Sequence, residues 1–285
     1  MKIAISAEST IDLSKEQLKQ YGIETIPFTI SLGEETRLDG DLKSSEIIEF
    51  VNKTGKLPKT SAINQYTYEE YFKGLKEKGY DAIIHISLSS AISVANHQCN
   101  LAANEVANVY VIDSKSLSSG IALLAIYAAQ LRDEGCGANE IYNKVLQRVP
   151  FVQASFVLAR LDYLYKGGRC SSIAHFFSRA LGIRPQILVK DGKMGSGKKY
   201  RGADNAVIKK YCEDTLAEFN NPDKSLVFVT STQFPNDNAV NIAVDACRKA
   251  GFKNIVIANA GATITSHCGE RTLGILYIND GGKEQ

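Results

Sequence analysis

The sequence predicts an α/β protein of two domains, the first a doubly wound, mostly parallel sheet and the second a mixed sheet with helices. Short runs of β-branched residues alternate with longer segments of helical periodicity, which is the pattern of sheets covered by helices on both faces. The chain of 285 residues is longer than most single hydrophobic cores support. We therefore expect an N-terminal α/β domain over 1–150 and a C-terminal α/β domain over 151–285, with Pro150 marking the break.

In the N-terminal half, apolar runs such as AIIHI are continuous, as in strands buried on both faces of a sheet. Thr67 and Glu70 form a capping box that predicts the start of a helix, and Gly79 has the place of a glycine after the helix C-terminus. The predicted strands are 2–6, 24–30, 82–86 and 109–113, and the predicted helices are 44–54, 67–79, 93–108, 116–134 and 138–149.

In the C-terminal half, the dipeptide Asp191-Gly192 is a strong signal for a β-hairpin and predicts antiparallel pairing. A mixed rather than purely parallel sheet follows. The predicted strands are 154–159, 184–194, 225–231, 254–259 and 273–278, and the predicted helices are 171–181, 203–219 and 237–250.

Composition excludes several classes of function. The net charge of +2 gives no bulk attraction to nucleic acid or to an anionic membrane. The longest apolar stretch, GIALLAIYAAQL, is too short to span a bilayer, and the N-terminus lacks the apolar segment of a signal peptide. The six cysteines form no C-x-x-C pair, which argues against disulfides and zinc and fits reduced thiols in the cytoplasm.

The stretch GKMGSGKK at 192–199 has the G-x-x-x-x-G-K spacing of a phosphate-binding loop. Lys199, however, stands where a Ser or Thr should hold magnesium, and no helix is expected before Ala203. A hairpin with a basic turn is the favoured interpretation, and a nucleotide-dependent kinase is an alternative. The turn could dock an acidic partner or a phosphate, because it gathers five basic residues: Lys190, Lys193, Lys198, Lys199 and Arg201.

Two hydroxyl clusters precede predicted helices. Thr60 and Ser61 form one, and Ser87, Ser89, Ser90 and Ser93 follow a buried strand. Ligands of open α/β sheets bind beyond the carboxyl ends of strands, where helix N-termini favour anions. Taken alone, each cluster is explained as well by helix capping.

His267 lies in the polar segment TSHCGERTLG between two apolar runs, so a catalytic base, a metal ligand and an anion partner are all conceivable. The four histidines share no metal-ligand spacing, which argues against a metal site. The chain has many serines, so a Ser/His hydrolase of acyl esters is an alternative. It has no G-x-S-x-G nucleophile elbow to support that alternative. Arg169 follows two glycines, as in a tight turn that presents a guanidinium or in a plain helix C-cap.

Together these segments resemble the DegV family of bacterial fatty-acid-binding proteins over almost the full length. The matching segments are SAESTIDLS, LPKTSAINQ, SLSSAIS, VIDSKSLSSG, LDYLYKGGRCSS, RPQILVKDGKM and ATITSHCGERTLGI, in the family's order.

The resemblance implies a carrier and not an enzyme. It implies one long-chain fatty acid, such as palmitate or oleate, between two α/β domains, with no other cofactor. Some members present the acyl carboxylate to a fatty acid kinase, which makes the acyl phosphate. By motif, the carboxylate contacts fall on Thr60, Ser61 and Ser93, with His267 in the supporting hydrogen bonds. Arg169 matches a family position for the headgroup or for the kinase.

The chain departs from the family pattern in three places. Glu8 replaces an aspartate, Val94 and Ala95 replace a glycine and a threonine, and Glu270-Arg271 replaces a proline and a glycine. Ser93 and His267 are retained, so carboxylate binding is still expected. Chain-length preference and kinase recruitment are the properties that these departures affect.

Overall fold

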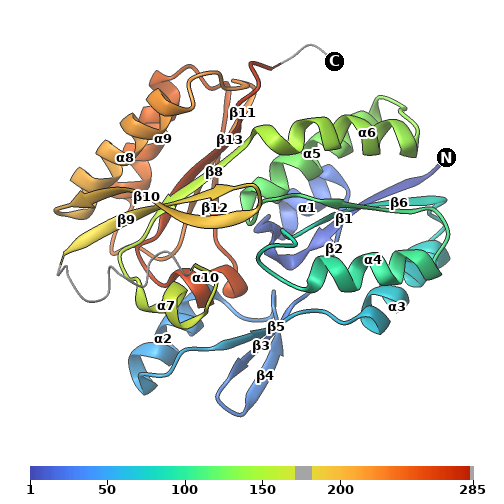
Figure 1. Ribbon diagram of the computed structural model, residues 1–285, viewed down its shortest axis with the longest axis horizontal. Helices are drawn as coiled ribbons and strands as arrows, with labels where there is room; N and C mark the ends of the chain where they lie inside the picture. Colours follow the sequence, from blue (N-terminus) through green and yellow to red (C-terminus); the bar gives the residue numbers. More distant parts are fainter. Residues whose placement is uncertain (171–181, 283–285) are drawn as a thin grey trace.

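The computed structural model describes residues 1–170 and 182–282 (Figure 1). The first sheet is wholly parallel, with the order β2-β1-β6-β7. Its strands are β1 (Ile3–Glu8), β2 (Ile23–Ile26), β6 (Ala82–Ser87) and β7 (Val109–Asp113). From β1 the chain runs to β2 on one side and later to β6 on the other, so the strand order reverses between β1 and β6. That reversal is where open α/β sheets usually bind ligands.

The second sheet is mixed, with the order β10-β9-β8-β13-β11-β12, and β11 with β12 forms its one parallel pair within the described residues. Its strands are β8 (Val152–Val157), β9 (Ile183–Lys190), β10 (Lys193–Arg201), β11 (Leu226–Ser231), β12 (Asn254–Asn259) and β13 (Leu273–Ile278). The α/β class with one parallel and one mixed sheet is confirmed. The predicted hairpin is confirmed too, because Asp191 (φ 49°) and Gly192 (φ 80°) form its turn.

A small antiparallel sheet, with the order β4-β3-β5, is an excursion between β2 and β6. Its strands are β3 (Thr29–Leu32), β4 (Glu35–Leu38) and β5 (Lys59–Ser61). The single strand predicted over 24–30 is wrong, because β2 and β3 belong to different sheets. Pro27 separates them, and proline has no N–H to donate to a ladder.

The helices cover the two large sheets and fill the space between them (Figure 1). They are α1 (Lys15–Tyr21), α2 (Ser44–Thr54), α3 (Gln65–Glu77), α4 (Ala95–Glu105), α5 (Ser119–Asp133), α6 (Ala138–Arg148), α7 (Asp162–Lys166), α8 (Asp204–Glu218), α9 (Asn238–Lys249) and α10 (Ala262–Cys268), with 3-10 turns η1 (Ser9–Ile11) and η2 (Val149–Phe151). The helix predicted over 171–181 lies outside the described residues.

Three helix starts differ from the sequence prediction by two residues or more. The helix predicted from residue 116 begins at Ser119. The cap of α3 is Asn64, whose side chain accepts a hydrogen bond from the Thr67 amide at 2.9 Å, so α3 begins at Gln65 and not at Thr67. The helix predicted from residue 93 begins at Ala95, because the Ser93 hydroxyl accepts the Ala95 amide and remains outside the helix. Gly79 follows α3 with φ 85°, as predicted.

The main hydrophobic core is continuous between the two halves of the chain. Helix α5 is buried nearly all round and contacts β1 and β6 of the first sheet as well as β8, β11 and β13 of the second. Ile5 and Phe156 belong to this same cluster. A second core lies beneath α8 and α9. The region where the two sheets meet is therefore closely packed, and it contains the candidate site.

Candidate functional site

A narrow cavity lies beyond the carboxyl ends of β1 and β6, between the two halves of the chain. Its free volume is about 50 Å³, and an adjoining cavity of about 30 Å³ shares the walls Leu117, Phe156, Ile264 and Cys268. Further apolar walls are Phe28, Leu88, Ile92, Leu164 and Met194. The second cavity is lined by apolar side chains and by the hydroxyl residues Ser118, Thr230, Ser231, Thr232 and Thr272, yet the surface that it exposes is mostly apolar. The guanidinium of Arg169 and the imidazole of His267 belong to residues that line the first cavity. This arrangement suits an elongated ligand with one polar end.

Thr60 and His267 meet at the first cavity although 207 residues separate them in sequence. Thr60 comes from β5 of the small sheet, and His267 comes from α10 of the C-terminal half. Helix α10 packs against β3, β5 and α2, so the excursion of the first half holds α10 in place. The Thr60 Oγ1 to His267 Nε2 distance is 2.8 Å.

His267 is a neutral imidazole, because burial and then the positive charge of Arg169 lower its pKa to about 4. Nδ1 is buried, has no hydrogen-bond partner among the described residues and lies against Gly167. A Cβ on Gly167 would come within 2.7 Å of Nδ1, so this close approach requires glycine. A proton on Nδ1 would be an orphaned buried donor, which proteins avoid. Nε2–H therefore donates to Thr60, and the Thr60 hydroxyl is left to donate to another group.

Ser93 is the only member of its predicted cluster at this cavity among the described residues. Its Oγ accepts the Ala95 amide at 3.1 Å, which leaves its O–H for donation. Ser87 donates to Glu8 at 2.9 Å, and Ser89 donates to the carbonyl of Gly192 at 2.8 Å. The capping interpretation and the ligand interpretation of Ser93 are thus compatible.

Ser61 is not brought to the cavity. Successive residues of a strand point to opposite faces, so Thr60 lines the cavity while Ser61 is exposed on the other side of β5. Arg169 borders the cavity and is itself exposed, with its guanidinium donating to the carbonyl of Gly167. The structure therefore groups Thr60, Ser93, His267 and Arg169 and leaves Ser61 out.

The stretch 192–199 forms no phosphate-binding loop. It begins in the hairpin turn and continues as β10, paired with β9, and α8 begins only at Asp204. The Lys198 amide, which such a loop would direct at a phosphate, donates to Gln186 at 3.2 Å. The Lys198 ammonium lies 3.7 Å from Asp214 and 3.6 Å from Glu218 on α8. Lys199 and Arg201 are exposed.

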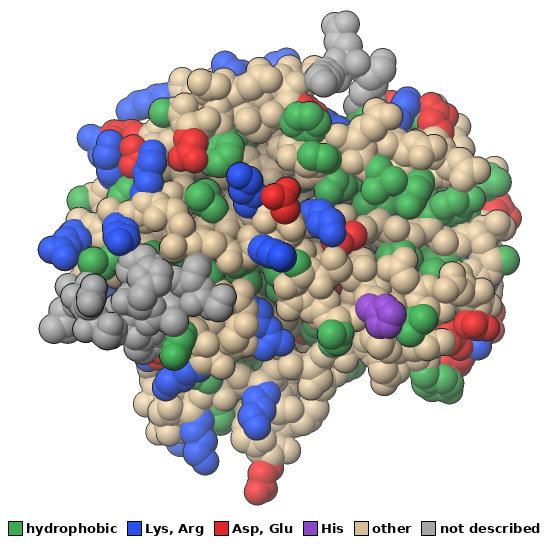
Figure 2. Space-filling view, in the orientation of Figure 1, with side chains coloured by type: hydrophobic (Ala, Val, Ile, Leu, Met, Phe, Trp, Pro, Cys, Tyr) green, Lys and Arg blue, Asp and Glu red, His purple; other side chains and the backbone are tan. Residues whose placement is uncertain are grey.

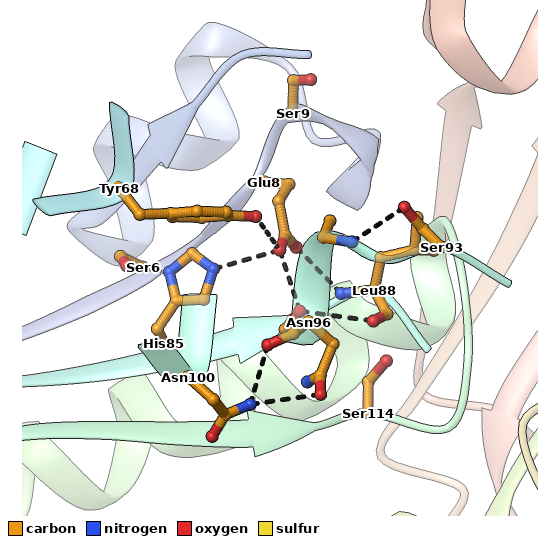
Figure 3. Close-up of polar contacts among 12 residues, drawn as sticks. Ser6, Glu8, Ser9, Tyr68, His85, Leu88, Ser93, Asn96, Asn100 and Ser114 are labelled. Atoms are coloured by element: carbon orange, nitrogen blue, oxygen red, sulfur yellow. Dashed lines mark hydrogen bonds and ion pairs between the residues drawn. The ribbon is translucent and has the colours of Figure 1, made fainter. Parts of the chain in front are cut away.

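A buried polar cluster beside the cavity was not predicted (Figure 3). The Glu8 carboxylate is fully buried and accepts hydrogen bonds from Tyr68 at 2.7 Å, Ser87 at 2.9 Å and the Leu88 amide at 2.9 Å. His85 Nε2 lies 3.3 Å from the same carboxylate. Burial alone would raise the pKa of Glu8, but the attraction of His85 and these hydrogen bonds hold it below its ordinary value.

This cluster resembles a Ser-His-acid set, since Ser6 lies 2.7 Å from His85 Nδ1. All three side chains are fully buried on the sheet, where a substrate cannot reach them. The cluster instead fixes the loop Leu88–Ser93, because Glu8 holds the Leu88 amide. The sequence feature that could have indicated this cluster is Glu8, a charged residue at the end of the apolar strand that begins IAIS.

A larger cleft of about 590 Å³ opens between η1, the start of α1, the segment 38–42 at the end of β4, and β12, and it contains none of the predicted site residues. Its acidic side chains Asp12, Asp39 and Asp41 do not suit an acyl chain. Asp12 accepts hydrogen bonds from Ser118 and from the Gly261 amide, which joins the two halves, and burial raises its pKa to about 8.

Within residues 1–170 and 182–282, no three His, Cys, Asp or Glu side chains are grouped so that they could hold a metal ion. In the same ranges no helix has both the length and the apolar character needed to cross a membrane.

Arg271, in the place of a family glycine, keeps a left-handed backbone (φ 54°) and pairs with Asp204 at 2.9 Å.

Comparison with known proteins gives consistent matches over the whole chain. The chain is 30% identical over 285 residues to a fatty acid-binding protein of Thermotoga maritima, covering 96% of each chain. A crystal structure of a DegV lipid binding protein from the same organism has a TM-score of 0.85 at 28% identity, covering 98% of this chain and 99% of that one. A stearic acid-binding protein of Eubacterium ventriosum has a TM-score of 0.85 at 25% identity over the full length of both chains. The sequence profile of the DegV family, described as uncharacterised proteins, matches residues 2–280, and the chain therefore belongs to the DegV family.

Proposed function

We propose that this protein binds one long-chain fatty acid in the cavity between its two halves, with the carboxylate at Thr60 and Ser93 and the tail between the apolar walls. The observation that carries the proposal is the Thr60–His267 pair, because the neutral imidazole donates to Thr60 and leaves the threonine O–H for an anion. Ser93 offers a second O–H at the same cavity. Two relatives named above are described as binding fatty acids, which supports the same ligand class.

The energetics favour a long tail. Burying ~15 methylenes at ~0.8 kcal/mol each gives roughly 12 kcal/mol. Association costs about 4–15 kcal/mol, so the gain from the tail alone is of the same size as that cost. Each hydrogen bond to the charged headgroup adds about 1.5–3 kcal/mol. The hydroxyls therefore select acids over uncharged lipids, while the tail supplies most of the affinity.

The two cavities are narrow, with free volumes of about 50 and 30 Å³. Small movements of the shared walls Leu117, Phe156 and Ile264 would widen the passage for the chain. Flexible side chains such as Met194 allow part of that movement.

The protein purified from bacterial cells is expected to carry roughly one acyl chain per molecule, because the apolar walls hold a tail strongly. Native mass spectrometry shows the added mass, and extraction with organic solvent followed by chromatography identifies the acid. Protein that contains no acyl chain and also fails to bind added palmitate or oleate would contradict the proposal.

A carrier role accounts for the site better than hydrolysis does. A triad histidine needs a carboxylate on the nitrogen opposite its nucleophile, but Nδ1 of His267 lies against Gly167. The depressed pKa of His267 also makes it a weak base. We therefore propose a non-catalytic protein, working in the cytoplasm, where its six free cysteines stay reduced.

We further propose that the bound acid is presented to a fatty acid kinase at the face that carries Arg169. Lys and Arg side chains gather on this face around the β9–β10 hairpin and α7 (Figure 2). Lys190 and Lys193 flank the hairpin turn and are exposed. Of the predicted docking residues, Lys198 is the least suited, because Asp214 and Glu218 neutralise it. Lys199 and Arg201 are exposed at the other end of β10, away from the hairpin turn.

Reversing Lys190 and Lys193 to Glu is expected to slow phosphorylation of the bound acid by a fatty acid kinase about tenfold at low salt, because charges at a rim steer association. Palmitate affinity should stay unchanged, and the difference should shrink as salt screens the charges. The matched control is Lys209→Glu on α8, an exposed lysine outside the hairpin. Equal rates for both reversals at low salt would remove the hairpin from the docking surface.

A further inference from the structure

Two threonines in the wall of the first cavity have no hydrogen-bond partner among the described residues. Thr10 in η1 is 0% exposed and Thr263 in α10 is 4% exposed. The Oγ1 atom of each is buried and unpaired, and both residues line the cavity. Buried hydroxyls are normally hydrogen-bonded, so two unpaired hydroxyls on residues that line one cavity call for an explanation.

Their neighbours show that the local backbone could have satisfied such groups. Next to Thr10, the Ser9 hydroxyl donates to Asp39 at 2.8 Å and accepts the Phe28 amide at 3.1 Å. Close to Thr263, the Thr265 hydroxyl donates to the carbonyl of Ala260 at 3.3 Å, and Ser266 donates to that of Ala262 at 2.7 Å. Among these five neighbouring hydroxyls, only those of Thr10 and Thr263 lack a partner, and both residues line the cavity.

Thr263 lines the first cavity from the same helix as His267. Thr263 and His267 are four residues apart and share a face of the helix, about 6 Å along its axis. Ile264 and Cys268 form the next such pair and also line the adjoining apolar cavity, which continues to Ala260 beyond the start of α10. Thr263 is therefore close to the part of a bound acid next to its carboxylate.

Both hydroxyls lack a partner among the described residues and are already out of reach of water, which is costly, and a plain hydrocarbon tail leaves them in that state. An oxygen on the ligand would remove that cost. We propose that Thr10 and Thr263 form a second polar site that receives a hydroxyl or keto oxygen on the acyl chain, near its carboxyl end. The inference rests on the proposed function, since it concerns the ligand of the same cavity.

The test measures the affinities of the delipidated full-length protein for palmitate and for a positional series of hydroxypalmitates. One isomer with its hydroxyl near the carboxyl end is expected to bind about tenfold more tightly than palmitate, the ratio that one recovered hydrogen bond gives. In Thr263→Val, which keeps the shape and removes the hydroxyl, that preference should disappear while the affinity for palmitate stays unchanged. The matched control is Thr265→Val on the same helix, whose hydroxyl is bonded to the backbone.

Each outcome separates the two proposals. If no hydroxypalmitate binds better than palmitate in wild type, or if Thr263→Val keeps the preference, the second polar site is disproved while fatty acid binding stands. If Thr263→Val weakens palmitate itself, Thr263 contacts the carboxylate and the second site is equally wrong. If neither palmitate nor any hydroxypalmitate binds, the proposed function fails first. Thr10→Val, measured in the same way, keeps the test informative if Thr263→Val does not fold.

Discussion

Removing the hydroxyls of Thr60 and Ser93 together, as Thr60→Val with Ser93→Ala, is expected to weaken fatty acid binding at least about a hundredfold. Each hydroxyl donates to a charged headgroup at ~1.5–3 kcal/mol, and ~1.4 kcal/mol corresponds to a tenfold change. Valine keeps the shape of threonine, so the apolar walls remain intact. Isothermal titration with palmitate measures the loss.

Ser61→Ala is the matched control for that double variant. Ser61 is next to Thr60 but is exposed and faces away from the cavity, so its loss should leave the affinity unchanged. Thermal unfolding must accompany the titration, since Thr60→Val also takes the partner of His267 away. A double variant that binds palmitate as tightly as wild type would mean that the carboxylate lies elsewhere, and a weakened Ser61→Ala would restore Ser61 to the site.

Glu8→Ala is expected to lower the free energy of unfolding by about 3–5 kcal/mol, because three buried groups lose their hydrogen-bond acceptor at about 1–3 kcal/mol each. The substitution leaves the Tyr68 hydroxyl, the Ser87 hydroxyl and the Leu88 amide without their acceptor. Urea unfolding followed by circular dichroism measures the change. Alanine at the exposed Glu49 of α2 is the control and should leave the unfolding midpoint unchanged.

The contribution of Glu8 should depend on pH in a defined direction. Its folded pKa is depressed, so its stabilisation is complete above the unfolded value of about 4.3 and is lost as pH falls through the folded pKa. The difference between wild type and Glu8→Ala should therefore be constant near neutral pH and shrink in acid below about pH 4. A difference that grows on acidification would show that the carboxylate is not held in its charged form.

Local chemistry is what made parts of this protein predictable. Asp191-Gly192 allows the left-handed turn that its hairpin needs, and the continuous apolar run at β6 reflects burial on both faces. Ser93 could be found because its position after a strand of a parallel sheet already implies a ligand edge. Ser61 could not be separated from Thr60, because only the pairing of β5 with β3 decides which residue faces inward.

Other parts depend on contacts between segments far apart in the chain. Helix α10 is rich in threonine, which disfavours helix, so its packing against α2 and the small sheet decides its conformation. The Thr60–His267 pair depends on the same packing. The role of Glu8 required knowledge that Tyr68 and Ser87 lie beside it. Sequence spacing carries none of this information.

The burial of α5 has a consequence for how the protein folds. Although its residues precede Pro150, this helix contacts strands of both large sheets. A fragment that ends at residue 150 would leave one side of α5 in water, and the remainder would lose the wall against which β8 and β13 pack. We therefore expect that neither half folds when it is produced alone. Chemical denaturation of the intact chain should follow a single cooperative transition, and a ligand held between the sheets stabilises the entire molecule by mass action.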